Sequence, residues 1–251
     1  MLNGELAFLV VRFLRLFLVL TLIGYGASVR ADAGLLIDKT RLVFPATSKE
    51  ETLYIHNVNS YPVMVQNWID DGDIDADLGT LKTPLLVVPP LFKLQPNESK
   101  SVRVILGRHR LPAERESVFW LNVQMIPPVD PNKTNGLAVS VRTRMKVFYR
   151  PESLIKGGST AWIQKVTCSA GQGSAAYIEC VNPTPYYATV DALTLSFSRS
   201  ASVKTMDGFM LAPYDRQRYA VSTVKGLSVI TLSLVNDDGY VEKKTVNVRE
   251  R

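Results

Sequence analysis

The sequence feature that most constrains the fold is an alternation of apolar and cationic residues between Asn135 and Pro151. Residues of one parity are mostly apolar: Leu137, Val139, Val141, Thr143, Met145, Val147 and Tyr149. Residues of the other parity are largely cationic: Ser140, Arg142, Arg144, Lys146 and Arg150. Because successive side chains of a β-strand point to opposite faces, this pattern predicts one long strand with an apolar and a cationic face.

Such a strand has two possible uses. It can bury its apolar side chains inside its own domain, or it can offer them to another chain. The alternation by itself favours the first use, an internal strand of a β-sandwich. The second use stays open, because the predicted strand is about twice as long as a typical one.

The first 31 residues have the features of a secretory signal peptide. Two arginines precede an apolar run from Leu16 to Ile23, and small residues then lead to Val29-Arg30-Ala31. The run is too short for a membrane-spanning helix, which needs about 20 apolar residues. We therefore predict a signal peptide over residues 1–31, cleaved after Ala31 or Ala33, and an exported protein without stable membrane insertion.

After the predicted signal peptide, the whole chain has the pattern of short β-strands separated by turns. Short alternating runs are separated by turn residues, and no helix-period stretch of useful length appears. About 220 residues remain, which suits two sandwiches of roughly 100 residues each. Pro151 and the run from Lys156 to Ser159 mark a linker. The prediction is an all-β chain with two β-sandwich domains, over residues 32–151 and 152–251.

Three local predictions follow from composition. The runs Glu51–Val58 and Val63–Ile69 flank a turn and are predicted to form a hairpin. The run Val118–Ile126 is mostly apolar, which predicts a central strand. The acidic run Asp70–Leu78 lacks the glycine and glutamate positions of an EF-hand, so it is predicted to be a solvated loop without calcium.

Cys168 and Cys180 are the two cysteines of the chain. An even number of closely spaced cysteines in an exported protein predicts a disulfide. Each cysteine flanks a β-like run, and Gly171–Ser174 is predicted to form a turn between them, so the bridge would join the strands of a hairpin. Two cysteines and two distant histidines make no ligand set, so no metal site is predicted.

The sequence carries no catalytic signature. It has no Gly-x-Ser-x-Gly elbow, His-Glu-x-x-His motif, phosphate-binding loop or dinucleotide fingerprint. His56 and His109 lie in a strand-like run and a basic turn, where a catalytic role is not expected. The formal net charge of +6 is not concentrated in basic clusters with interleaved aromatic residues. We predict neither an enzyme nor a nucleic-acid-binding protein, and no cofactor.

Six motifs together resemble the PapD-like periplasmic chaperones of usher-assembled pili. They are DKTRLVFPA at 38–46, PPLFKLQP at 89–96, RESVFWLNVQMIPP at 115–128, RMKVFYRP at 144–151, NPTPYY at 182–187 and VNDDG at 235–239. The resemblance covers nearly all of the chain after the leader. It implies two immunoglobulin-like domains in an L or boomerang arrangement, and location in the periplasm. The short loop over residues 127–135, with no cysteine pair around it, resembles the short-loop branch of the family.

The resemblance also implies roles for individual residues. The long strand would be lent to a pilus subunit, which is donor-strand complementation. The donor side chains would be Leu137, Val139 and Val141. Arg41 and Lys146 would bind the C-terminal carboxylate of the subunit. A charge network that fixes the interdomain angle would consist of Glu116, Arg150 and Asp237, and the turn at Pro62 would face the usher.

The implied function is that of an assembly chaperone. It would bind, fold and cap pilus subunits, the tip adhesin included, and deliver them to the outer-membrane usher. The alternative is a structural or adhesive immunoglobulin-like pilus component. Such a component would normally be a single incomplete sandwich, whereas this chain has two apparently complete domains, which favours the chaperone.

Overall fold

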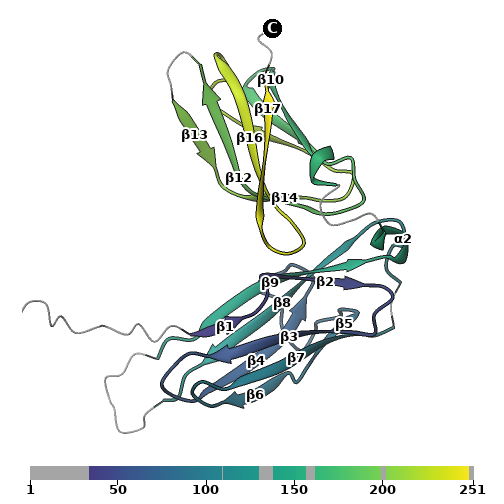
Figure 1. The fold of residues 1–251 in the computed structure, drawn as a ribbon, viewed down its shortest axis with the longest axis vertical. Coiled ribbons are helices and arrows are strands. Elements are labelled where there is room, and N and C mark those ends of the chain that lie inside the picture. Colours follow the sequence, from purple (N-terminus) through teal and green to yellow (C-terminus); the bar gives the residue numbers. More distant parts are fainter. Residues whose placement is uncertain (1–33, 109, 130–137, 157–161, 199–201, 249–251) are drawn as a thin grey trace, which may run out of the picture. The chain divides into compact units, whose positions relative to one another are not determined.

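The computed structural model describes residues 34–108, 110–129, 138–156, 162–198 and 202–248 (Figure 1). The predicted signal peptide, His109 and the predicted donor residue Leu137 lie outside the described residues. The description below concerns the unit Gly34–Arg251. None of the described helices is long and apolar enough to cross a membrane.

Residues before Pro151 form two sheets around one apolar core (Figure 1). The first sheet has the order β1-β3-β7-β5, with β1 Leu35–Ile37, β3 Glu50–Asn57, β7 Ser99–Leu106 and β5 Leu85–Val88. The second has the order β2-β9-β8-β4-β6, with β2 Arg41–Pro45, β9 Val141–Arg150, β8 Ser117–Ile126, β4 Val63–Asp70 and β6 Leu91–Leu94. Alternate side chains of these strands enter the core, as period-two sequences require.

Residues after Pro151 form a second pair of sheets around a separate core. One sheet has the order β10-β11-β15, with β10 Thr167–Gln172, β11 Ala176–Val181 and β15 Arg216–Ala220. The other has the order β13-β12-β16-β17, with β14 also paired to β12; their bounds are β12 Ala188–Phe197, β13 Val203–Met206, β14 Phe209–Leu211, β16 Leu227–Val235 and β17 Val241–Asn247.

The helices among the described residues are short. They are α2 (Glu152–Ile155) and the 3-10 turn η1 (Ile163–Lys165). The all-β prediction is therefore confirmed. The predicted central strand is also confirmed, because β8 lies between β9 and β4. The two apolar cores draw on residues on either side of the predicted linker, while the domain limits themselves stay predictions.

The predicted strand from Asn135 was too long, because β9 begins only at Val141. Its partner β8 ends at Ile126, and Met125 pairs with Val141. Two prolines follow β8, and proline has no backbone N–H to donate to a ladder. Ser140 uses its side chain instead, and its hydroxyl donates to the carbonyl of Met125 at 2.8 Å.

The predicted hairpin of β3 and β4 is wrong, because the two strands lie in different sheets. β3 pairs with β1 and β7, whereas β4 pairs with β6 and β8. The side chains of two buried asparagines donate hydrogen bonds to backbone carbonyls at the connection that crosses between the sheets. Asn57 Nδ2 donates to the Leu94 carbonyl at 3.2 Å, and Asn59 Nδ2 donates to the Gly34 carbonyl at 2.9 Å. Apolar and polar residues alternate in the same way whether two consecutive strands pair in a hairpin or lie in different sheets. The alternation therefore does not distinguish the two arrangements.

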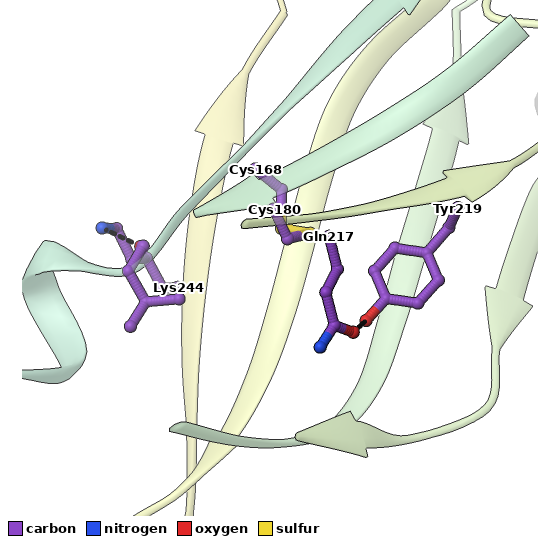
Figure 2. The surroundings of a disulfide bond; sticks show 6 residues. Cys168, Cys180, Gln217, Tyr219 and Lys244 are labelled. Carbon is purple, nitrogen blue, oxygen red and sulfur yellow. Dashed lines mark hydrogen bonds between the residues drawn. A yellow bond between two sulfur atoms is a disulfide. The ribbon is translucent and has the colours of Figure 1, made fainter. Parts of the chain in front are cut away.

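The predicted disulfide is confirmed. Cys168 on β10 and Cys180 on β11 are direct cross-strand partners, and their sulfur atoms are bonded (Figure 2). The turn between the strands begins after Gln172, slightly later than predicted, because β10 continues through Gly171. In the neighbouring strand β15, the Tyr219 hydroxyl donates to Gln217 Oε1 at 2.6 Å. Burial and the nearby charge of Asp215 raise the pKa of Tyr219 to about 12.

Removing the disulfide should destabilise the second domain. Cys168 and Cys180 are 12 residues apart in sequence, and in the chain-entropy model a loop of this size contributes about 3 kcal/mol. We expect the double variant Cys168→Ala, Cys180→Ala to lose about that much free energy of unfolding in urea. Wild-type protein with its bridge reduced serves as the control and should lose a similar amount. An unchanged unfolding midpoint in both samples would show that the bridge adds no stability.

Candidate functional site

Three of the predicted site residues, Val141, Lys146 and Arg150, lie on β9, and this strand is only partly covered. β8 pairs with β9 from Val141 to Tyr149. On the other side, β2 pairs in parallel with β9 only over residues 146–150. In the part of the chain that the structure describes, no strand pairs with Val141–Met145 on the side opposite β8. Among the described strands, Val141–Met145 is therefore an open sheet edge, which we call the open half of β9.

The apolar parity of β9 divides near the same point, between Thr143 and Met145. Met145, Val147 and Tyr149 are buried in the core of their own domain. Val139 and Val141 share that parity, yet their exposed fractions are 56% and 45%. An open edge that carries exposed apolar side chains pairs readily with another chain. Natural proteins therefore usually cover or interrupt such an edge. The second half of β9 is therefore an internal strand, whereas the apolar side chains at its start are left exposed.

The parallel pairing of β2 with β9 places Arg41 directly opposite Lys146. Lys146 has no ion-pair partner in the described part of the chain. Burial, followed by the neighbouring charge of Arg41, lowers the pKa of Lys146. The two predicted anchor residues are therefore brought together, and they repel one another.

Arg41 is constrained by the backbone of the second domain. Its Nη1 donates to the carbonyl of Val235 at 3.2 Å, while its Nε is buried and makes no hydrogen bond. Burial lowers the pKa of Arg41, and the charge of Asp237 only partly opposes this. Among the residues that the structure describes, neither cation has a carboxylate in hydrogen-bond contact, and two partly buried cations of this kind favour an anion between them, because an anion stabilises both charges.

The predicted charge network is also brought together at the end of β9. Arg150 Nε donates to Glu116 Oε1 at 2.7 Å, and its two Nη atoms donate to the Asp237 carboxylate at 2.6 and 2.9 Å. The second oxygen of Glu116 accepts from the backbone N–H of Tyr187 at 2.8 Å. Burial lowers the pKa of Arg150, but the hydrogen bonds and charges of Asp237 and Glu116 outweigh it and raise the pKa.

The network gives a stability prediction. Glu116 and Arg150 are 3% and 8% exposed, so Arg150→Ala leaves a buried carboxylate without its cation. Breaking a buried pair in this way costs about 3–5 kcal/mol, and we expect a loss of that size in urea unfolding. The exposed pair of Arg103 and Glu50 is the control, because Arg103→Ala should cost about 0–1 kcal/mol. Equal losses for the two variants would contradict this account.

Two features bear on the remaining predictions. Pro62 precedes β4 at the sheet-crossing connection, and nothing in the fold tests its predicted role toward the usher. Among the described residues, no group of three or more histidine, cysteine or acidic side chains could hold a metal ion.

Sequence reasoning missed Asp70. It was assigned to a solvated loop, but it is the last residue of β4 and is fully buried. Extending the alternation of β4 by one residue beyond Ile69 would have placed Asp70 on the same face as Trp68. Its carboxylate forms ion pairs with Arg142 and Arg144, which belong to the cationic face of β9.

Comparison with known proteins identifies the family. The family model described as "Pili and flagellar-assembly chaperone, PapD N-terminal domain" matches residues 34–155, and that of the PapD C-terminal domain matches residues 161–246. The chaperone protein PapD of Escherichia coli is 33% identical over 214 residues, which are 83% of this chain and 84% of that protein. The chain belongs to the PapD family of pilus assembly chaperones.

Other PapD-family members agree in length and fold. The chaperone protein MrkB of Klebsiella pneumoniae is 31% identical over 212 residues, which are 82% of this chain and 87% of that protein. The crystal structure of the Pseudomonas aeruginosa CupB2 chaperone is 27% identical, with a TM-score of 0.68, and the match covers 85% of this chain and 100% of that one. Membership of the PapD family confirms the resemblance and assigns a non-enzymatic class of protein. It also decides against a structural pilus component.

Proposed function

We propose that this PapD-family chaperone works in the periplasm, where it binds, folds and caps pilus subunits, a tip adhesin among them. It then delivers them to an outer-membrane usher. The observation that carries the proposal is the pair Arg41 and Lys146 at the end of an open strand edge, two partly buried cations that contact no carboxylate of the described residues. This is a binding function, and it requires neither a cofactor nor a catalytic group.

The open half of β9 supplies the binding surface. A subunit that lacks a strand can pair its backbone with the edge at Val141–Met145, which is β-strand addition. Backbone hydrogen bonds depend little on sequence, so one edge can serve several subunits. Val139 and Val141 would fill the apolar groove of the subunit, together with Leu137. Burying each of these side chains contributes about 1.5–3 kcal/mol.

The cation pair supplies the register. A chain-terminal carboxylate bound by Arg41 and Lys146 would place the end of the subunit at a fixed point beside β9. Charge-assisted hydrogen bonds of this kind are short and directional. Register matters, because a slip of one residue would turn every apolar side chain of the paired strand to the wrong face.

The network around Arg150 supports the same site from the second domain. Asp237 follows β16, and Val235 at the end of β16 accepts the hydrogen bond from Arg41. Gly239 lies in the same turn with a φ of +89°, and a side chain there would clash with the Thr40 hydroxyl. We assign the network the role of holding this turn against Arg41 and so fixing the angle between the domains.

Two finer points belong to the same proposal. The sequence from Pro127 to Asn135 is short, which supports membership of the short-loop branch, and the turn at Pro62 would face the usher. The function is tested by expressing the chain with the exported proteins encoded beside it and identifying what co-purifies. The expected result is an equimolar complex with immunoglobulin-like pilus subunits. Recovery of the chain alone, under conditions where those subunits are made, would contradict the proposal.

A further inference from the structure

Apart from Met145, the open half of β9 receives little support from the core of its own domain. The side chains of Val141 and Thr143 are exposed on the face that enters the core elsewhere in the strand. One backbone edge is also unpaired in the described chain. A segment with few buried apolar contacts and a single pairing partner opens locally at low free energy. An ordered donor edge therefore needs support from its other face.

That support comes from a buried carboxylate two strands away. The side chain of Asp70 on β4 is 1% exposed and forms ion pairs with Arg142, at 3.5 Å, and with Arg144. Asn122 of the intervening strand β8 joins the cluster. Its Nδ2 donates to Asp70 Oδ2 at 2.6 Å, and its Oδ1 accepts from Arg142 Nε at 2.8 Å. The cluster thus connects β4, β8 and β9 across the back of the sheet.

The same two arginines also lie over the rings of two tryptophans. The guanidinium of Arg142 lies 4.8 Å from the ring centre of Trp68, and that of Arg144 lies 5.3 Å from the ring centre of Trp120. Arginine over an aromatic face gains a cation–π interaction, which is strongest for tryptophan. Each arginine is therefore fixed both by a carboxylate and by a ring.

The segment after β4 closes the cluster. The backbone N–H of Gly72 donates to Asp70 Oδ1 at 2.8 Å, and Arg142 Nη1 donates to the carbonyl of Ile74 at 3.0 Å. Gly72 has a φ of +118°, and a side chain there would meet the Trp120 ring at 3.1 Å. Burial raises the pKa of Asp70, but the hydrogen bonds from Arg144, Asn122 and Gly72 outweigh it and lower the pKa, so the carboxylate is ionised.

We propose that Asp70 is a positioning residue, which holds the open half of β9 extended and in register through Arg142 and Arg144 before a subunit binds. This inference rests on the proposed function and deepens it. Asp70 is buried on the back of the sheet and acts through β9 without touching the subunit. A donor edge that is already ordered loses less conformational entropy on binding, which favours both association rate and affinity.

The test uses the full-length chaperone carrying Asp70→Asn, which keeps the side-chain shape and removes the charge. In the free protein, the amides of Val141–Met145 that bond to β8 should exchange hydrogen at least tenfold faster. Amides of β9 beyond Lys146 and of β16 should be unchanged. Association with a co-expressed pilus subunit should slow about tenfold. The control Glu50→Gln removes the carboxylate of an exposed pair on the other sheet and should change neither rate.

Several outcomes would overturn the inference. If hydrogen exchange at Val141–Met145 is unchanged, or speeds up equally across the whole domain, then Asp70 does not specifically order the donor edge. If exchange at Val141–Met145 is faster but the association rate is unchanged, then the order that Asp70 gives to the edge does not contribute to subunit binding. If Asp70→Asn fails to fold, Arg142→Gln, which alters a partly exposed side chain, must show the same local effect. Failure of the wild-type protein to bind any subunit would contradict the proposed function while leaving the exchange result intact.

Discussion

Lys146→Ala should weaken subunit binding by roughly 30-fold or more, while the free chaperone stays folded. Removing one partner of a desolvated charge-assisted contact costs about 2–5 kcal/mol, and each 1.4 kcal/mol is about tenfold in affinity. Arg41→Ala should have an effect of the same order. Both are measured as the dissociation constant of the purified subunit complex.

The stability of the free protein separates a binding role from a structural one. Lys146 has no ion-pair partner in the described residues, and the charge of Arg41 lowers its pKa. Removing Lys146 therefore relieves a repulsion, and urea unfolding should show unchanged or slightly increased stability. A purely structural lysine would give the opposite sign. Lys204→Ala, at an exposed position of β13, is the matched control and should leave binding unchanged.

The identity of the anion can be tested with the subunit instead of the chaperone. A subunit whose C-terminal carboxylate is converted to an amide should bind wild-type chaperone about as weakly as the normal subunit binds Lys146→Ala. The two changes together should cost little more than either alone, because they remove the same contact. Normal recovery of subunit by both Arg41→Ala and Lys146→Ala would rule out the carboxylate anchor.

The second large effect is expected at Val141. Val141→Asp should weaken subunit binding by at least about 100-fold, because it removes about 1.5–3 kcal/mol of apolar burial and places a charge in an apolar groove. The free protein should keep its stability, since the side chain is 45% exposed. Val139→Asp should act in the same direction.

A matched control distinguishes the donor edge from any exposed valine. Val203 lies on the edge strand β13 of the second domain and is 64% exposed. Val203→Asp introduces the same charge on another sheet edge and should leave subunit binding unchanged. If Val141→Asp binds subunits as well as Val203→Asp does, then this half of β9 is not the part that is lent.

Period-two patterns and turn residues predicted most strands, but not their partners. The central position of β8 and the disulfide between β10 and β11 followed from local composition, because both depend on neighbouring residues. The pairing of β3 and β4 did not, since alternation does not say which sheet a strand joins. The start of β9 at Val141 depends on where β8 ends, which is a property of two distant segments.

In the candidate site too, contacts between residues that are distant in sequence could not be predicted from local patterns. No local pattern relates Arg41 to Lys146, because they meet only through the parallel pairing of β2 with β9. Resemblance to the family named them, as it named Glu116, Arg150 and Asp237, which the fold brings into contact. Asp70 matched no quoted motif, and it was missed because an acidic residue at the edge of an acidic run resembles a solvated loop.

The central claim, that the open half of β9 is lent to a pilus subunit, is tested most directly by hydrogen exchange. Outward-facing amides of Val141–Met145 are compared in the free chaperone and in its purified complex with a subunit. If these amides pair with the subunit, their exchange should slow by at least about 100-fold, as expected for hydrogen bonds in a sheet. Unchanged exchange there, with new protection elsewhere on the chaperone, would contradict strand donation by β9.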